Sequence, residues 1–163
     1  MSHRLQQSLK TKQQGFILLE LLALVAGILF ASSCIFLQSD KLWRHYHKEQ
    51  VRMSALLLAS DLRQLQQQAL FQTDASAHDL KPTADRTGYY LTTKGVATSS
   101  VRFADYACAG VYFDAVLARL AFSQNGAPST SGFYRLRHRE LEGFAYQVDV
   151  QPVTGRVLAY ETQ

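Results

Sequence analysis

Hydrophobic residues form one continuous run near the N-terminus, and two different periodic patterns follow it. The run extends over 22 residues, from Phe16 to Leu37, and Glu20 is its only charged residue. At about 1.5 Å per residue, a helix of this length is roughly 33 Å long, which is enough to cross the hydrocarbon core of a membrane. The pattern therefore predicts a transmembrane helix over residues 16–37.

Apolar residues continue beyond this run at helical spacing. They recur at intervals of three and four residues and so share one helix face: Val51, Ala55, Leu58, Leu62, Leu65 and Ala69. No proline lies between Phe16 and Lys81. We therefore expect residues 38–73 to be an amphipathic continuation of the same helix. It should end near Gln72, because residues 73–82 have the composition of a helix-ending loop.

After Pro82 the period changes to two residues, which predicts short strands. We expect strands over residues 88–92, 100–103, 110–113, 117–122, 133–139, 144–150 and 157–160. Asn125-Gly126 predicts a turn between two of them. Strands that follow one long helix favour an α+β fold. In this fold the antiparallel β-sheet of a globular head, residues 74–163, packs on the apolar face of the helix.

Charge separates a basic leader, residues 1–15, from the rest of the chain. The leader contains Arg4, Lys10 and Lys12 and no acidic residue, which predicts a cytoplasmic N-terminus and a head on the other side of the membrane. Of the chain's 17 Lys and Arg residues, 14 remain outside the leader, against 13 Asp and Glu. The basic character is thus mostly a property of the leader. By itself it is no evidence for nucleic-acid binding, and 163 residues allow one small domain plus the anchor.

The start of the apolar run contains a specific motif. A lone carboxylate in an apolar membrane segment is costly and indicates a functional site. The stretch Gly15-Phe16-Ile17-Leu18-Leu19-Glu20 resembles the N-terminus of type IV pilin-like proteins, with a prepilin peptidase site of the form Gly-Phe-x-x-x-Glu. Residues 120–126 and 155–157 resemble, more weakly, the heads of H-type minor pseudopilins of type II secretion, and of FimT-like and competence minor pilins.

This resemblance implies a structural subunit of a secretion, pilus or DNA-uptake filament. Prepilin peptidase would cut after Gly15 and methylate the new amino terminus at Phe16. Sibling pilins, an inner-membrane assembly platform and membrane lipid would be the partners. In the filament, Glu20 of one subunit would pair with the Phe16 amine of another. Alternatively, Glu20 lies at the interfacial edge and only snorkels toward water. Major pilins often have a proline where this chain has Leu37, so its absence favours a minor or initiating subunit.

Other N-terminal signals explain less of the sequence. A plain signal anchor of an extracytoplasmic binding protein accounts for the apolar span and its basic flank, but not for Gly15 and Glu20 at this spacing. A secretory signal peptide has a shorter apolar region, with a small-residue cleavage site after it. The segment Ala31-Ser32-Ser33-Cys34 lacks the leucine that is usual in a lipoprotein cleavage site.

Arginines alternate along one predicted strand. Arg135, Arg137 and Arg139, the arginine stripe, should project from one sheet face while Tyr134 and Leu136 face inward. Such a stripe can bind the phosphates of DNA, which would make the chain a receptor in DNA uptake.

We expect His138 and Arg156 to lie near this stripe. The simpler interpretation is a solvated face balanced by Glu140 and Glu142. It is favoured because no aromatic residue interleaves with the arginines.

No catalytic motif is present, and we expect neither an enzyme nor a cofactor. His45 and His47 diverge on a helix, and with no third ligand expected nearby we predict no metal site. Cys34 lies in the apolar run and Cys108 in the head, which argues against a disulfide between them. Both are expected to be buried as small apolar residues.

Overall fold

The computed structural model describes the chain except for residues 1, 72–77, 94–95 and 163; of residues 2–17 and 37 it describes the backbone alone. The fold is α+β, as predicted. The helix α1 spans Ser2–Phe71. In the described part of the chain, the strands that follow are β1 (His78–Pro82), β2 (Gly88–Thr93), β3 (Val96–Arg102), β4 (Val111–Ala115), β5 (Leu120–Ala121), β6 (Gly132–His138), β7 (Ala145–Val150) and β8 (Val157–Thr162). A 3-10 helix, η1 (Phe103–Tyr106), separates β3 from β4. The chain divides into two compact units, Met1–Trp43 and Arg44–Gln163.

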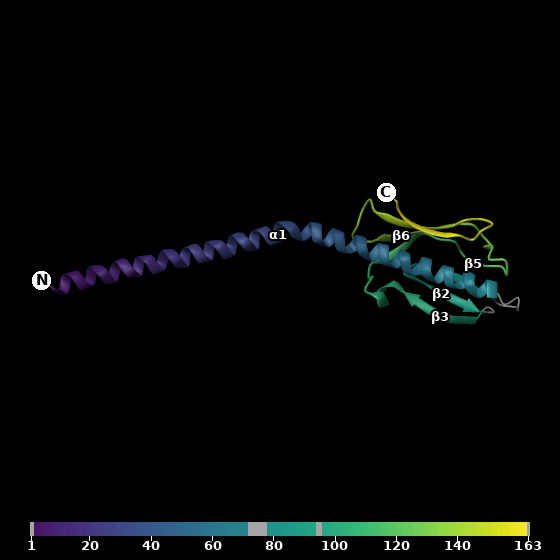
Figure 1. Cartoon of the computed structure of the whole chain (residues 1–163), viewed down its shortest axis with the longest axis horizontal. Coiled ribbons are helices and arrows are strands. Elements are labelled where there is room, and N and C mark those ends of the chain that lie inside the picture. The colour runs from purple at the N-terminus through teal and green to yellow at the C-terminus, as the bar shows by residue number, and fades with distance from the viewer. Residues whose placement is uncertain (1, 72–77, 94–95, 163) are drawn as a thin grey trace. The chain divides into compact units, whose positions relative to one another are not determined.

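The second unit is built around the C-terminal part of α1. The predicted helix face is confirmed, since its apolar residues are all at most 7% exposed: Val51, Ala55, Leu58, Leu62, Leu65 and Ala69. In Figure 1, β2 and β3 lie on one side of this part of the helix and β6 lies on the other. The helix ends at Phe71, next to the predicted end at Gln72, which lies outside the described residues.

In its described residues the head contains two antiparallel sheets, where we expected one. The first has the strand order β3-β2-β1-β5 and the second the order β4-β6-β7-β8. The first sheet depends on β1, which the sequence analysis assigned to a helix-ending loop. Residues 78–82 resemble a loop because three of them are ionisable and the last is proline. They form a strand because β2 pairs along one side and β5 along the other.

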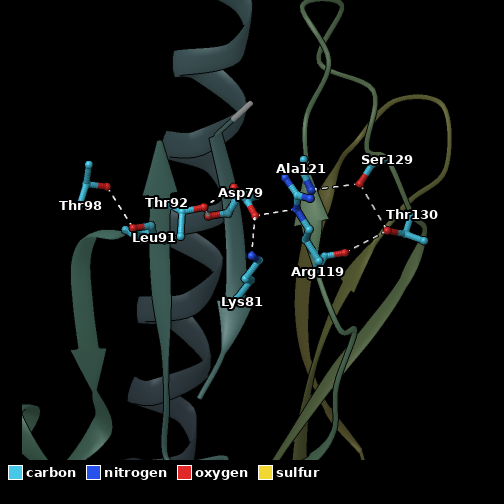
Figure 2. A network of polar contacts seen from close by, with 9 residues as sticks. All are labelled: Asp79, Lys81, Leu91, Thr92, Thr98, Arg119, Ala121, Ser129 and Thr130. Carbon is cyan, nitrogen blue, oxygen red and sulfur yellow. Dashed lines mark hydrogen bonds and ion pairs between the residues drawn. The ribbon is translucent and has the colours of Figure 1, made fainter. Parts of the chain in front are cut away.

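A buried carboxylate fixes β1 to β5. Asp79 is fully buried, and the Nε atom of Arg119 lies 2.6 Å from its Oδ2 atom. The Thr92 hydroxyl donates to Oδ1, and the Lys81 ammonium lies 3.9 Å from Oδ2 (Figure 2). A carboxylate tolerates this burial because charge and hydrogen bonds compensate its lost hydration. Asp79 therefore holds the segment after β4 against the first sheet. We expected a strand over residues 117–122 of this segment, but only the two residues of β5 form one.

Aromatic rings connect the two sheets through the core. Tyr89 of β2 contacts Phe103 of η1, Phe103 contacts Phe113 of β4, and Phe113 contacts Tyr134 of β6, with centroid distances of 6.1, 5.2 and 5.8 Å. Both tyrosines are buried, but only one hydroxyl has a partner in the described part of the chain. Tyr89 donates to Asp61 of α1 over 2.6 Å, whereas the Tyr134 hydroxyl makes no hydrogen bond there. Burial raises the pKa of both phenols, and for Tyr89 the Asp61 carboxylate raises it further.

These two tyrosines give a matched pair of substitutions. Tyr89→Phe removes the donor to a carboxylate and should cost about 1.5–3 kcal/mol of unfolding free energy. Tyr134→Phe removes an unpaired buried hydroxyl and should be neutral or stabilising. Thermal unfolding of the detergent-solubilised chain, followed by circular dichroism, measures both. A larger loss for Tyr134→Phe than for Tyr89→Phe would contradict this assignment.

Candidate functional site

The N-terminal unit exposes the apolar segment that contains Glu20. Within the described residues, one helix, α1, is both long enough and apolar enough to cross a membrane, by length and composition. Leu18, Leu19, Leu21 and Leu22 are all exposed around the exposed Glu20. The side chains of Gly15 and Phe16 lie outside what the structure describes. The chain leaves the described part of this apolar surface bare, so lipid or other protein has to cover it in the native setting.

The two cysteines have different surroundings. Cys108 is buried, as expected, whereas Cys34 is exposed on α1, so the expectation of burial is wrong for Cys34 in the isolated chain. Both thiols are free.

The arginine stripe forms only in part. Arg135 and Arg137 project from β6 on the face opposite to the buried Tyr134 and Leu136, as predicted. Arg139 is exposed but follows the end of the strand.

The acid that balances the stripe is Asp114, where we expected Glu140 and Glu142. Its Oδ2 atom lies 3.3 Å from Nε of Arg137 and 3.9 Å from Nη1 of Arg135. Asp114 can reach them because β4 pairs with β6, with Tyr112 opposite Arg137 and Phe113 opposite Leu136, so alternation along β4 places Asp114 on the same face as the two arginines. Sequence periodicity does not reveal which strands pair.

Three further expectations about the stripe need correction. His138 faces inward and is buried, so it does not join the stripe. Arg156 lies in the turn before β8 and directly precedes Val157, which is in the row of Gly132, at the other end of β6 from Arg137. An aromatic residue does flank the stripe, since the Arg135 guanidinium lies 5.3 Å from the centroid of the Phe133 ring.

The inward-facing His138 belongs to a cluster that sequence analysis missed. His47 of α1, His138 at the end of β6 and Glu140 after it have potential ligand atoms within 4.8 Å of one another. The two imidazole rings stack with centroids 4.0 Å apart, and the Glu140 carboxylate lies 3.1 Å from Nε2 of His47. The expectation that no third ligand lies near His47 is therefore wrong. His138 and Glu140 follow His47 by 91 and 93 positions in sequence, so only the β4-β6 pairing and the packing of α1 bring the three residues together.

Burial and the stacked ring of His47 both favour the neutral form of His138 by lowering its pKa. Desolvation lowers the pKa of His138 most, and the neighbouring His47 lowers it further, against a hydrogen bond to the Ala109 carbonyl that raises it. Gly110 lies directly beside this ring, where a Cβ atom would come within 2.6 Å of Nε2 of His138. Glycine also suits the backbone here, since φ at this position is +90°.

The two head segments singled out by the resemblance lie together on α1. Gln66 donates to the carbonyls of Gly126 and Thr154 over 2.9 and 3.1 Å. A Cβ atom on Gly155 would lie 2.3 Å from the Gly126 carbonyl oxygen, so only glycine allows this approach. These segments therefore have a structural role, which is to fix two loops to the end of the helix.

No family model matches the sequence, and no curated protein matches it. Among solved structures, the chain is similar to the type IV minor pilin FimU of Pseudomonas aeruginosa, with 14% sequence identity. The match covers 67% of this chain and 91% of that chain, with a TM-score of 0.48. Similarity at this level does not assign a family, so the function has to be argued from the chain's own residues.

Proposed function

We propose that this chain is a structural minor pilin or pseudopilin subunit, anchored in the cytoplasmic membrane through the first part of α1. The observation that carries the proposal is Glu20, the only charge in the apolar run, exposed among bare leucines on α1. A carboxylate at such a place is retained where it has a specific partner.

Processing creates that partner. In the proposed pathway, prepilin peptidase removes residues 1–15 on the cytoplasmic side, and Phe16 becomes a methylated amino terminus that keeps its positive charge. The basic leader holds the N-terminus in the cytoplasm and the head outside. The assembly platform then extracts the subunit into a secretion, pilus or competence filament, where the bare surface of α1 packs against sibling subunits.

Pairing between subunits sets their register. Glu20 of one subunit meets the Phe16 amine of its neighbour, and each charge loses much of its burial cost only when both subunits are present. An apolar helix surface alone would allow many registers, whereas one buried ion pair favours a single one.

The first prediction concerns processing. Gly15→Val should leave the full-length precursor, because the peptidase site accepts a small side chain before the cut. The matched control is Gly27→Val in the same apolar segment, where a Cβ atom would meet no other group within 4 Å. The control should be processed normally. Mass spectrometry of the mature protein measures both, and an N-terminus other than Phe16 in the wild type would refute the assignment.

The second prediction concerns assembly. Glu20→Ala should insert and be cleaved, and insertion should improve because an acid at depth costs about 2.5–3.5 kcal/mol. Co-assembly should fail, since the neighbouring Phe16 amine loses its partner. Glu49→Ala, outside the span, is the control. Crosslinking to sibling pilins measures the effect, and unchanged crosslinking in Glu20→Ala would place Glu20 among residues that only snorkel.

A DNA-binding receptor is the second candidate function. The observation in its favour is that Arg135 and Arg137 share an outward face with Phe133, and base stacking with backbone contacts is how single strands are bound. The observation against it is Asp114, which already partners both arginines. We therefore rank the structural role first.

The third prediction tests this ranking. The full chain in detergent should bind DNA weakly or not at all. Asp114→Asn should strengthen any binding by releasing the arginines. If three phosphate contacts form, log affinity should fall with log salt at a slope of about −2.7, and replacing Arg135, Arg137 and Arg139 with Gln should flatten it. Fluorescence anisotropy across a salt series measures this. Submicromolar, salt-sensitive binding by the wild type would make DNA uptake the leading function.

A further inference from the structure

We infer that His47, His138 and Glu140 form an acid-sensitive contact between α1 and the connection from β6 to β7, which holds while His138 is neutral and opens when His138 takes up a proton. The two imidazole rings stack with centroids 4.0 Å apart and planes 25° from parallel. The Glu140 carboxylate lies 3.1 Å from the His47 ring. We call these three residues the histidine contact. It does not depend on the proposed function of Glu20.

The hydrogen bonds of the His138 ring fit only its neutral form. Its Nε2 atom lies 3.0 Å from the carbonyl oxygen of Ala109, and a carbonyl can only accept, so Nε2 carries a proton. Its Nδ1 atom accepts the backbone N–H of Glu140 over 3.1 Å, so Nδ1 carries a lone pair. A second proton can bind only at Nδ1. There it would face the N–H of Glu140, donor against donor, and this hydrogen bond would be lost.

The hydrogen bonds of the His47 ring fit a cation instead. Gln50 donates its amide N–H to the carbonyl of Ala107 over 2.7 Å, which leaves its Oε1 atom 3.0 Å from Nδ1 of His47. The other nitrogen, Nε2, lies 3.1 Å from Oε2 of Glu140. Both nitrogens therefore face acceptors, and an imidazolium, which donates from both, satisfies them together. The stack thus pairs a neutral ring with a ring that is suited to carry charge.

Protonation of His138 would place two positive rings face to face. Among the described residues, the titratable groups that act on His138 are His47 of α1 and Glu140 of the connection, and the segment before β4 contributes the Ala109 carbonyl. Burial lowers the pKa of His138 most and His47 lowers it further, whereas the Ala109 carbonyl and the Glu140 carboxylate raise it. The net direction is downward, so the unfolded chain takes up this proton more readily than the fold does. The stability that neutral His138 contributes is therefore complete above the ordinary histidine pKa of 6.5 and is lost as the pH falls below it.

Glu140 transmits the change from one ring to the other. Its backbone N–H meets His138 and its carboxylate meets His47, so a backbone that turns away from a protonated His138 also withdraws the carboxylate from α1. The same connection contains Leu141 and Phe144, both 7% exposed and part of the core cluster. Opening the histidine contact would make these two apolar side chains accessible. The rest of the core is apolar and does not titrate, so the opening should stay local.

The experiment is a pH titration of the full chain in detergent, with ¹⁵N-labelled histidine side chains observed by NMR from about pH 8 to about pH 5. At neutral pH, Nδ1 of His138 should give the signal of an unprotonated nitrogen and Nε2 that of an N–H. The midpoint of its titration should lie below 6.5. With the same midpoint, the Glu140 amide should lose protection from hydrogen exchange by about tenfold or more, relative to its intrinsic rate.

Variants of the two neighbours should move the midpoint in opposite directions. His47→Gln removes the stacked ring and its charge, so the midpoint should rise, whereas Glu140→Gln removes the carboxylate that favours the proton, so the midpoint should fall. His45 and Glu142 are exposed and lie two residues from His47 and Glu140. The control variants His45→Gln and Glu142→Gln should keep the wild-type midpoint.

A third variant separates the proton from the ring. His138→Asn keeps an acceptor near the position of Nδ1 but cannot be protonated, so the Glu140 amide should stay protected across the whole pH range. Circular dichroism at neutral pH shows which variants are folded. The wild type alone can overturn the inference, by a His138 midpoint at or above 6.5 or by a Glu140 amide whose protection does not follow that midpoint. Acid-induced loss of protection in folded His138→Asn would overturn it as well.

Discussion

The head depends on the burial of one helix face against both of its sheets. Six apolar residues of this face are removed from water at helical spacing, and they belong to one core cluster with buried residues of both sheets: Val51, Ala55, Leu58, Leu62, Leu65 and Ala69. Polar contacts then fix the helix to each sheet separately. Asp61 accepts from Tyr89 of the first sheet, and Arg63 donates to the carbonyl of Val157 in the second. Because the helix is the shared element, residues far apart in sequence become neighbours along it.

Two carboxylates in apolar surroundings separate folding from assembly. Asp79 is fully buried, and its compensating charges, Arg119 and Lys81, belong to the same chain. The free-energy cost of burying the Asp79 carboxylate is therefore compensated when the chain folds. Glu20 lies in an apolar run with no other charge, and the structure shows no ion pair for it within the described residues. In the proposed function the compensating charge of Glu20 belongs to another subunit, so association, and not folding, is the step at which its burial becomes favourable. This contrast is the physical basis for treating Glu20 as an assembly residue.

Sequence periodicity predicts what is local. The helix face and the inward Tyr134 and Leu136 follow from spacing alone, because period and burial are linked directly. The helix end near Phe71 follows from the composition of the residues after it. Pairing across the sheet is not local, which is why β1 was assigned to a loop and why Asp114 was not expected beside the arginines. The residues of β1 have low strand propensity, and strand formation there depends on two neighbours and a buried ion pair. Gly15, Phe16 and Glu20 remain predictions from the motif.

The cluster of His47, His138 and Glu140 lies at one end of the buried face of α1. His47 follows the apolar run and precedes the buried face, so it is close to where the membrane segment gives way to the head in sequence. His138 and Glu140 lie on either side of the end of β6. The stacked imidazoles of His47 and His138 and the contact between His47 and Glu140 tie the second sheet to the start of the buried helix face, where Val51 is the first of the buried apolar residues. Packing fixes the head along the rest of the helix. At this end polar atoms take over that role, because His47, Gln50 and the carbonyls of Ala107 and Ala109 replace apolar contact. Hydrogen bonds are directional, whereas apolar packing is not, so at this end of the buried helix face the polar contacts determine how the second sheet is oriented on α1.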